Sequence, residues 1–291
     1  MRPLRALLCA AALLHAALAN AAVSVVDDSG HSIVLPSPAT RIVSLAPHAT
    51  ELLFAAGAGD KIVGASEFSD HPEAAKRLPS VGGSMQLDIE RIVALKPDLV
   101  IAWKSGNSAR QLSRLRALGI TVFDSEPRSF EDIASSLERI GTLAGSDEGR
   151  IQATKFRATV QSLRQRYAKL SPVTVFYQIW PSPLMTLNDT HFVSEAIRAC
   201  GGVNIFGKLS ALVPTVSREA VVKADPDVIF ISDERQDAFD RWREFTQMKA
   251  VRQGNLARID GGAMNRPGPR LANATITLCE RIDDARRRKH Q

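Results

Sequence analysis

Two segments of the chain share one pattern, a short helix followed by a Pro-Asp turn and an apolar strand. The first occupies residues 87–107 (LDIERIVALKPDLVIAWKSGN) and the second residues 214–234 (PTVSREAVVKADPDVIFISDE). Glu90 and Glu219 are 129 residues apart, and the two Pro-Asp pairs keep the same step with no gap. This register predicts two lobes of similar construction, whether it arose by duplication or by shared constraint.

Strands and helices alternate on both sides of the chain's middle. Short apolar runs such as RIVSLA, KIVGAS, DLVIAW and ITVFD are separated by helical stretches, which favours βα units and parallel sheets. Residues 147–170 interrupt this alternation with apolar side chains at three- and four-residue intervals, the pattern of one amphipathic helix. The predicted fold class is α/β, with two βα lobes containing parallel sheets, a single long backbone helix joining them, and a ligand cleft between the lobes.

The first residues are typical of an export signal. Arg2 and Arg5 precede the apolar run 6–19, which small residues follow, as in cleaved secretory signal peptides. The run is shorter than the roughly 20 residues that a membrane-spanning helix needs. We therefore expect a soluble protein that is exported from the cytosol. The predicted division is a signal peptide at 1–21, an N-terminal α/β lobe at 22–145, a connecting helix at 146–171 and a C-terminal α/β lobe at 172–291.

The formal net charge of +6 is concentrated at the two ends of the chain. Two arginines lie in the leader, and residues 286–289 (RRRK) form a basic cluster near the C-terminus. A nucleic-acid-binding protein would carry its charge as a folded basic face. We therefore expect no nucleic-acid partner, and we interpret residues 286–289 as a frayed, solvated tail.

Cys200 and Cys279 remain once the leader is removed. A lone pair of cysteines in an oxidising compartment usually forms a disulfide, and two buried thiols are the alternative. No C-x-x-C spacing suggests a redox or metal role.

Motifs of catalysis are absent from the sequence. AAGAGDKIVG lacks the third glycine of a dinucleotide-binding loop, and no G-x-S-x-G or Walker A motif occurs. His48, His71 and His191 could hold zinc or manganese together with a carboxylate, but none belongs to a closely spaced histidine pair. We expect no enzyme activity, no cofactor and no metal site.

Large side chains stand just beyond apolar runs in both halves of the chain. Phe68, Trp103, Trp180 and Met264 occupy such positions. Taken singly, each is more often part of a core than of a site. Together, and because ligands of α/β proteins bind at strand ends, they predict a cleft with aromatic walls for a large, partly apolar ligand.

RIVSLAPHATELLFAAGAGDKIVGASEFSDHP, LDIERIVALKPDLVIAWKSGN and CGGVNIF resemble segments of the type III periplasmic binding proteins. The likeness extends over residues 41–282. Members of this family deliver siderophores, haem, metal ions or cobalamin (vitamin B12) to ABC importers, and the resemblance is greatest to the cobalamin-binding members. It implies two α/β lobes bridged by one long helix. It also implies a monomer that captures a corrinoid and docks on a membrane permease dimer.

The resemblance also implies roles for single residues. Phe68 and Trp103 match aromatic positions that face the ligand, and Arg266 matches an arginine of the closing segment. Cys200 and Cys279 match the family's disulfide. The full predicted ligand-binding set is Phe68, Trp103, Trp180, Met264, Asn265 and Arg266.

Glu90 and Glu219 match the two lobe glutamates that dock on arginines of the transporter. The alternative is that each is only an acidic residue favoured by the positive end of a helix.

The sequence also departs from the cobalamin-binding members. A tryptophan is missing around Ser84 and Met85, and DGGAMNRPGP replaces a more aromatic closing segment. The alternative cargo is therefore haem or an iron-siderophore on the same scaffold. Haem would need an axial ligand, for which Tyr177, His48 and His71 are the candidates.

Overall fold

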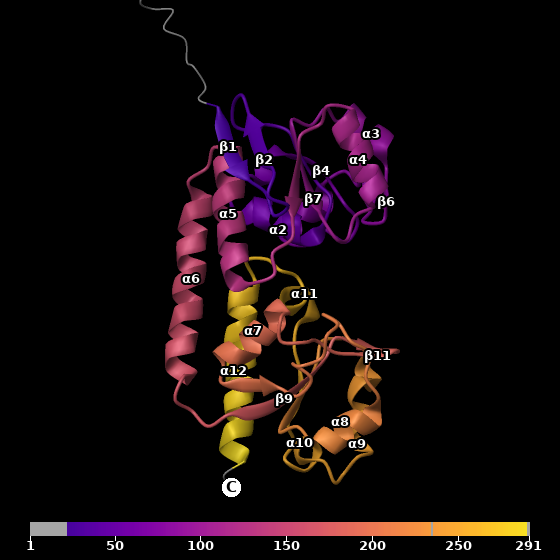
Figure 1. Cartoon of the computed structure of the whole chain (residues 1–291), viewed down its shortest axis with the longest axis vertical. Coiled ribbons are helices and arrows are strands. Elements are labelled where there is room, and N and C mark those ends of the chain that lie inside the picture. The colour runs from indigo at the N-terminus through magenta and orange to yellow at the C-terminus, as the bar shows by residue number, and fades with distance from the viewer. Residues whose placement is uncertain (1–21, 234, 290–291) are drawn as a thin grey trace, which may run out of the picture.

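The computed structural model describes residues 22–233 and 235–289, so the predicted signal peptide lies outside the described residues. Figure 1 shows two α/β lobes stacked along the long axis, with α6 (Glu148–Tyr167) running along one side. Each lobe contains a four-stranded, fully parallel sheet. The predicted fold class is confirmed. Within the described residues, no helix combines the length and apolar character needed to cross a bilayer.

The N-terminal sheet has the strand order β4-β3-β7-β8. Its strands are β3 (Ile42–Ser44), β4 (Ile62–Ala65), β7 (Leu99–Trp103) and β8 (Val122–Ser125). Its helices are α2 (Pro47–Ala55), α3 (Ile89–Ala94), α4 (Ala109–Ala117) and α5 (Phe130–Ala144), with 3-10 turns η1 (Gly59–Lys61) and η2 (Glu73–Arg77). Two antiparallel hairpins add β1 (Val23–Val26) with β2 (Ser32–Leu35), and β5 (Gly82–Gly83) with β6 (Gln86–Leu87).

The C-terminal sheet has the strand order β12-β9-β13-β14. Its strands are β9 (Val173–Gln178), β12 (Gly202–Asn204), β13 (Val228–Ile231) and β14 (Leu256–Arg258). Its helical elements are α7 (Phe192–Ala199), α8 (Arg218–Ala224), η3 (Gln236–Phe239), α9 (Asp240–Arg243), α10 (Lys249–Arg252), α11 (Gly261–Met264) and α12 (Leu271–Arg288). Strands β10 (Trp180–Pro181) and β11 (Leu184–Met185) form a short hairpin. Both sheets therefore order their strands second, first, third, fourth along the chain, as the repeated segment predicts.

The Pro-Asp turn plays the same part in both lobes. Asp98 accepts hydrogen bonds from the backbone N–H and the hydroxyl of Thr40, at 2.8 and 2.9 Å. Asp227 accepts the same pair of bonds from Thr174, both at 2.9 Å. Each threonine precedes or begins the first strand of its sheet, so each aspartate joins the third strand to the first. The repeated Pro-Asp turn therefore fixes the pairing of the first and third strands in each sheet.

Helix α6 (Glu148–Tyr167) joins the lobes, and one hydrophobic core continues along it. That core contains the α5–α6 contact of Phe130 with Phe156 and extends to Tyr167 and to Cys200 of the C-terminal lobe. Each sheet has a second, smaller core on its opposite face. A core shared by both lobes restricts the motion of one lobe against the other.

Helix α12 corrects the interpretation of the basic cluster as a frayed tail. Residues 286–288 form the end of this 18-residue helix, to which the sequence analysis assigned no element. Arg286 is buried and donates to the carbonyl oxygens of Ser171 and Cys200. Lys289 pairs with Asp227 at 3.0 Å. Only Arg286 is withdrawn from solvent, while Arg287, Arg288 and Lys289 are exposed, so the cluster is an ordered helix end with one buried member.

Cys200 and Cys279 form a disulfide, as predicted. It joins the end of α7 to the middle of α12 and closes a loop of 79 residues. A loop of that length corresponds to about 4 kcal/mol in the chain-entropy account. The disulfide therefore fixes α12 against the C-terminal sheet.

A buried carboxylate fastens the two lobes together. Glu51 of α2 is only 2% exposed and receives Arg270 Nε at 2.9 Å and Arg270 Nη2 at 2.7 Å. Arg266 Nη1 lies 3.2 Å from Glu51 and 2.5 Å from Asp70. A hydrogen bond from Arg266 lowers the pKa of Asp70. Both arginines belong to the segment between α11 and α12, which reaches up to α2 in Figure 1. We call this group of four residues the latch.

Replacing Glu51 with glutamine should lower the free energy of unfolding by about 3 kcal/mol, because two arginines would lose their buried counter-charge. The control is Glu73→Gln, since Glu73 pairs with Lys76 at the exposed surface. That change should cost under about 1 kcal/mol. Urea titration of both variants measures the difference, and equal losses would contradict a role for the latch in stability.

Candidate functional site: a cleft between the lobes

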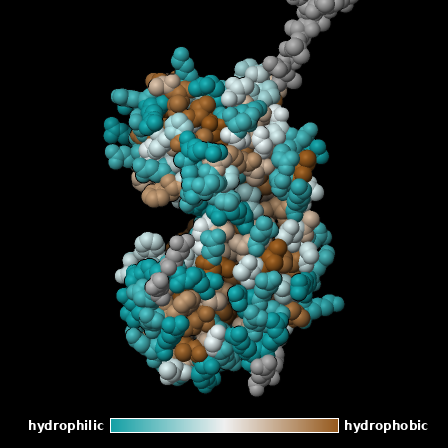
Figure 2. Space-filling model, turned by 180° about the vertical axis from the view of Figure 1, so that it is seen from behind, coloured by the Kyte–Doolittle hydropathy of each residue, from teal (hydrophilic) through white to brown (hydrophobic). Residues whose placement is uncertain are grey.

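The molecule is hollowed between its lobes, as the space-filling view shows (Figure 2). A cavity of about 280 Å³ lies there, and both lobes contribute to its lining. The N-terminal lobe supplies Trp103, Ser105, Glu126, Pro127 and Arg128, and the C-terminal lobe supplies Ile179, Thr190, His191, Phe192, Leu212, Val213, Asn265 and Pro267. Mostly apolar walls with a few polar groups are typical of a small-molecule site.

Trp103 ends strand β7 and is held from three sides. Its backbone N–H donates to Asn107 Oδ1 at 2.7 Å, and a Cβ on Gly106 would lie 1.9 Å from its ring. The ring also meets His48 edge-on at a centroid distance of 5.8 Å. Burial and, to a smaller extent, the charge of Arg266 lower the pKa of His48 to about 4, so His48 is a neutral packing partner at pH 7. Gly106 therefore leaves room for the ring of Trp103, and Asn107 holds its backbone.

Phe68 stands at the mouth of a neighbouring hollow in the N-terminal lobe. Its side chain is 78% exposed, although its backbone has φ = 62°, a region that non-glycine residues rarely occupy. This hollow, of about 440 Å³, is lined by Phe68 with Ser66, Glu67, Asp70 and Lys76 among others. The turn thus holds an exposed aromatic ring in a backbone conformation that is costly for phenylalanine.

The remaining predicted site residues, Asn265, Trp180 and Met264, lie in three different environments. Asn265 lines the cleft cavity and accepts the hydrogen bond of the Tyr177 hydroxyl at 2.7 Å. Trp180 is 57% exposed on the β10–β11 hairpin and does not line that cavity. Met264 is wholly buried in the shared core, so its prediction as a ligand contact is wrong in this structure. Helix α11, which carries it, lies in contact with α12.

Arg266 holds the lobes together instead of reaching into open space. Its guanidinium contacts Glu51, Asp70 and the Phe68 carbonyl oxygen. Because the latter two belong to the Phe68 turn, Arg266 also supports the residue predicted to touch the ligand. In this structure its role is to join lobes and to position that turn.

Sequence reasoning missed most of the cavity wall, although one signal was available. Ile179 directly follows β9, and Pro127 and Arg128 closely follow β8, so the strand-end rule points to all three. Leu212 and Val213 lie on a loop with no such signal. His191, the N-cap of α7, was considered only as a possible metal ligand, whereas it is buried in the cavity wall.

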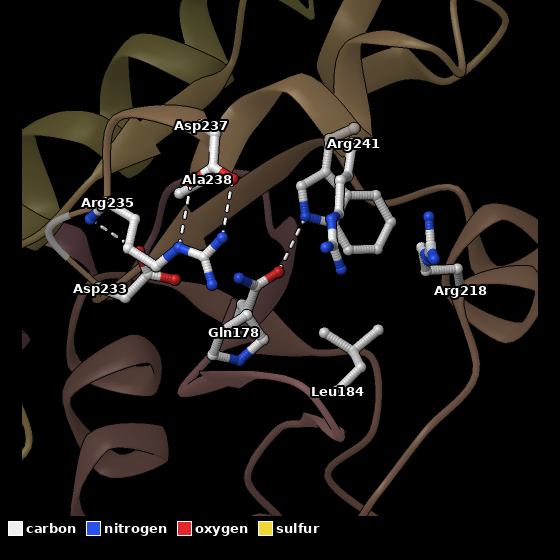
Figure 3. A pocket seen from close by; sticks show the side chains of 10 residues that line it. Gln178, Leu184, Arg218, Asp233, Arg235, Asp237, Ala238 and Arg241 are labelled. Atoms are coloured by element: carbon white, nitrogen blue, oxygen red, sulfur yellow. Dashed lines mark hydrogen bonds and ion pairs between the residues drawn. The ribbon is translucent and has the colours of Figure 1, made fainter.

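A second hollow lies in the C-terminal lobe at the end of its sheet (Figure 3). Arg235 donates to the Asp237 carboxylate through Nε at 3.0 Å and through Nη2 at 2.7 Å. Gln178 Oε1 accepts the indole N–H of Trp242 at 2.9 Å. Its volume of about 30 Å³ has room for about one water molecule, so it cannot hold a large ligand. Its polar groups support strand ends beside the cleft.

Asp27, His31 and Asp124 lie close enough together to hold a metal ion. Their carboxylates already have protein donors. Asp27 accepts from the N–H groups of Ser29 and His31, and Asp124 accepts from Arg116 at 2.6 Å. The group lies beside the β1–β2 turn, away from the cleft lining. Its contacts describe a structural junction of that hairpin with β8.

Glu90 and Glu219 occupy equivalent places. Each is the second residue of its helix, after the N-caps Asp88 and Ser217, and each is exposed. A backbone hydrogen bond, followed by the Ser217 hydroxyl, lowers the pKa of Glu219. Neither carboxylate forms an ion pair in the part of the chain that the structure describes. One exposed acid thus stands on each lobe.

Comparison with known proteins finds relatives that span nearly the whole chain. The vitamin B12-binding protein of Vibrio cholerae serotype O1 is 41% identical over 246 residues, which cover 84% of this chain and 89% of the relative. The vitamin B12-binding protein of Yersinia pestis (strain Pestoides F) is 39% identical over 252 residues, covering 86% and 89%.

Solved structures agree with these sequence relatives. The crystal structure of the periplasmic vitamin B12 binding protein BtuF of Vibrio cholerae has a TM-score of 0.77 at 39% identity and covers 85% of this chain and 98% of that chain. The periplasmic heme-binding protein RhuT from Roseiflexus sp. RS-1 has a TM-score of 0.75 at 25% identity, covering 84% and 98%. The profile of the periplasmic binding protein family matches residues 42–263, and the chain belongs to that family.

Proposed function

We propose that this chain is an exported, non-enzymatic receptor that captures cobalamin or a related corrinoid between its lobes and delivers it to an ABC importer in the inner membrane. The cleft cavity carries this proposal, because both lobes line it and its walls are mostly apolar. Trp103 and Phe68 offer aromatic surface to a large flat ligand. The relatives named for vitamin B12 binding support the choice of cargo.

The cleft is largely formed before the ligand arrives. The latch and the shared core hold the lobes together, which lowers the ordering cost of binding. We expect only a modest closing motion. The export signal at residues 1–21 would place this monomeric receptor in the periplasm.

Haem is the second candidate cargo, since a haem-binding protein shares the scaffold. The predicted axial ligands lend it little support. Tyr177 is wholly buried and its hydroxyl donates to Asn265, while His48 is buried with Nε2 3.2 Å from the Ser125 hydroxyl. His71 is exposed and lies outside the cavity lining. A corrinoid, which carries its own axial ligands, needs none of these residues.

Purified mature protein should bind cyanocobalamin tightly at one site, and hemin and a ferric siderophore far more weakly. Isothermal titration with the three compounds, together with absorption spectra, measures this preference. Strong hemin binding without a corrinoid complex would overturn the proposed cargo.

Replacing Phe68 with glycine or with alanine should distinguish the effect of the strained backbone on stability from the effect of the ring on corrinoid affinity. Both variants lose the ring, so both should bind the corrinoid more weakly, by roughly 1–2 kcal/mol. Glycine tolerates φ = 62° whereas alanine does not, so Phe68→Gly should be the more stable of the two by about 1 kcal/mol. Titration and thermal unfolding measure the two effects. Unchanged affinity in both variants would remove Phe68 from the site.

The double variant Glu90→Ala/Glu219→Ala should bind the corrinoid normally but fail in delivery. A charge pair buried on docking is worth about 2–5 kcal/mol, so receptor–transporter affinity should fall at least roughly 30-fold. The control is Glu73→Ala/Glu244→Ala, which removes two other exposed acids. Uptake by transporter vesicles measures delivery. Uptake equal to that of the wild type would contradict docking through these glutamates. Their role would then be a favourable interaction with the helix dipole, worth about 0.3–1 kcal/mol each.

A further inference from the structure

His191 occupies a position in the cleft wall that the proposed function has not used. It lies at the start of α7, lines the cavity and is 8% exposed. Its ring stacks on Phe192 at a centroid distance of 4.2 Å, which fixes the orientation of the imidazole. Such a ring offers at most one further polar contact to a ligand.

The backbone of α7 determines which ring nitrogen carries the proton. His191 Nδ1 accepts the N–H of Val193 at 3.2 Å and so acts as the N-cap of the helix. An accepting Nδ1 has no hydrogen, so the neutral ring carries its hydrogen on Nε2. Nε2 is therefore a donor and offers no lone pair to a metal.

Nε2 also keeps some accessible surface. Among the described residues, only Thr186 Oγ1 and Asp233 Oδ2 are fully buried side-chain atoms without a partner, and Nε2 is not one of them. No hydrogen bond joins it to another described residue. The ring is thus anchored at one nitrogen and available at the other.

We propose that His191 is a specificity-determining residue that donates its Nε2–H to a carboxamide oxygen on the rim of the bound corrinoid. This inference rests on the proposed function. Corrinoids carry carboxamide side chains around the ring, whereas haem carries carboxylates. The bound cobalt keeps its own axial ligands because the only free nitrogen of His191 is protonated.

The contact should not depend on pH in the physiological range. Burial lowers the pKa of His191 to about 4, so the ring stays neutral between pH 5.5 and 7.5. The charged groups around it are Glu126 and Arg128 across the cavity and Asp189 and Glu195 near its own helix.

Two substitutions separate the cap from the ligand contact. His191→Asn places an amide oxygen near the position of Nδ1 and removes the donor at Nε2, and asparagine is a good N-cap. His191→Gln places an amide N–H near Nε2 and removes the cap. For cyanocobalamin, His191→Asn should raise Kd roughly fivefold with an unchanged Tm. His191→Gln should keep Kd within about twofold but lower Tm by about 3 °C.

Titration calorimetry, thermal unfolding and absorption spectra of the two variants and the wild type decide the matter. We expect the cobalamin spectrum to be unchanged on binding and Kd to be constant from pH 5.5 to 7.5. Wild-type affinity in His191→Asn overturns this inference alone. A spectral shift that His191→Asn abolishes also overturns it, since the ring would then bind cobalt. No corrinoid binding by the wild type overturns the proposed function and this inference together.

Discussion

The relation between the lobes depends on one buried carboxylate. Glu51 belongs to the N-terminal lobe, yet its partners Arg266 and Arg270 come from the segment that leads into the last helix. A buried charge is stable only when paired, so this carboxylate requires the C-terminal lobe to be docked. The same Arg266 holds Asp70 and the Phe68 carbonyl oxygen. Docking of the lobes therefore also fixes the turn that carries Phe68.

A carboxylate of α7 forms a second polar contact between the lobes. Glu195 of α7 accepts the N–H of Phe130, the first residue of α5, at 2.8 Å and also pairs with Arg164 of α6. A carboxylate at a helix start is favoured by the helix dipole. With the latch and the continuous core, this contact leaves the two lobes few ways to move. The arrangement suits a receptor that binds a rigid ligand in a cleft formed in advance.

Much of the architecture could be predicted from the sequence because its signals are local. Strand and helix periodicity gave the lobes and helix α6, and the 129-residue step gave the repeated unit around Asp98 and Asp227. Helix α12 was missed although Ala274, Leu278 and Ile282 recur at four-residue intervals, the spacing that also marks α6. The pairing of its charges leaves no local pattern, since Arg286 reaches Ser171 and Cys200 only in three dimensions. Met264 was misplaced for a similar reason, since periodicity does not show which side of a four-residue helix meets the core.

The site was less predictable than the fold because contacts between lobes leave no pattern along the chain. Trp103 could be found from its place at a strand end. Arg266 could be found only through a family resemblance, and its observed partners differ from the predicted ones. His191 could not be found, since its role depends on the Nδ1 contact with Val193 and on a cavity built from the other lobe.

The repeated segment also explains how two similar lobes come to do different work. Glu90 and Glu219 stand at equivalent helix starts, so the lobes are alike on that face. At the strand end that matches Trp103, the second copy has Ser232, whose hydroxyl donates to the Gln178 carbonyl oxygen and accepts from Asn265. Asn265 in turn holds the Tyr177 hydroxyl. One lobe thus presents an aromatic wall, and the other uses the same position to orient polar groups, as an asymmetric ligand requires.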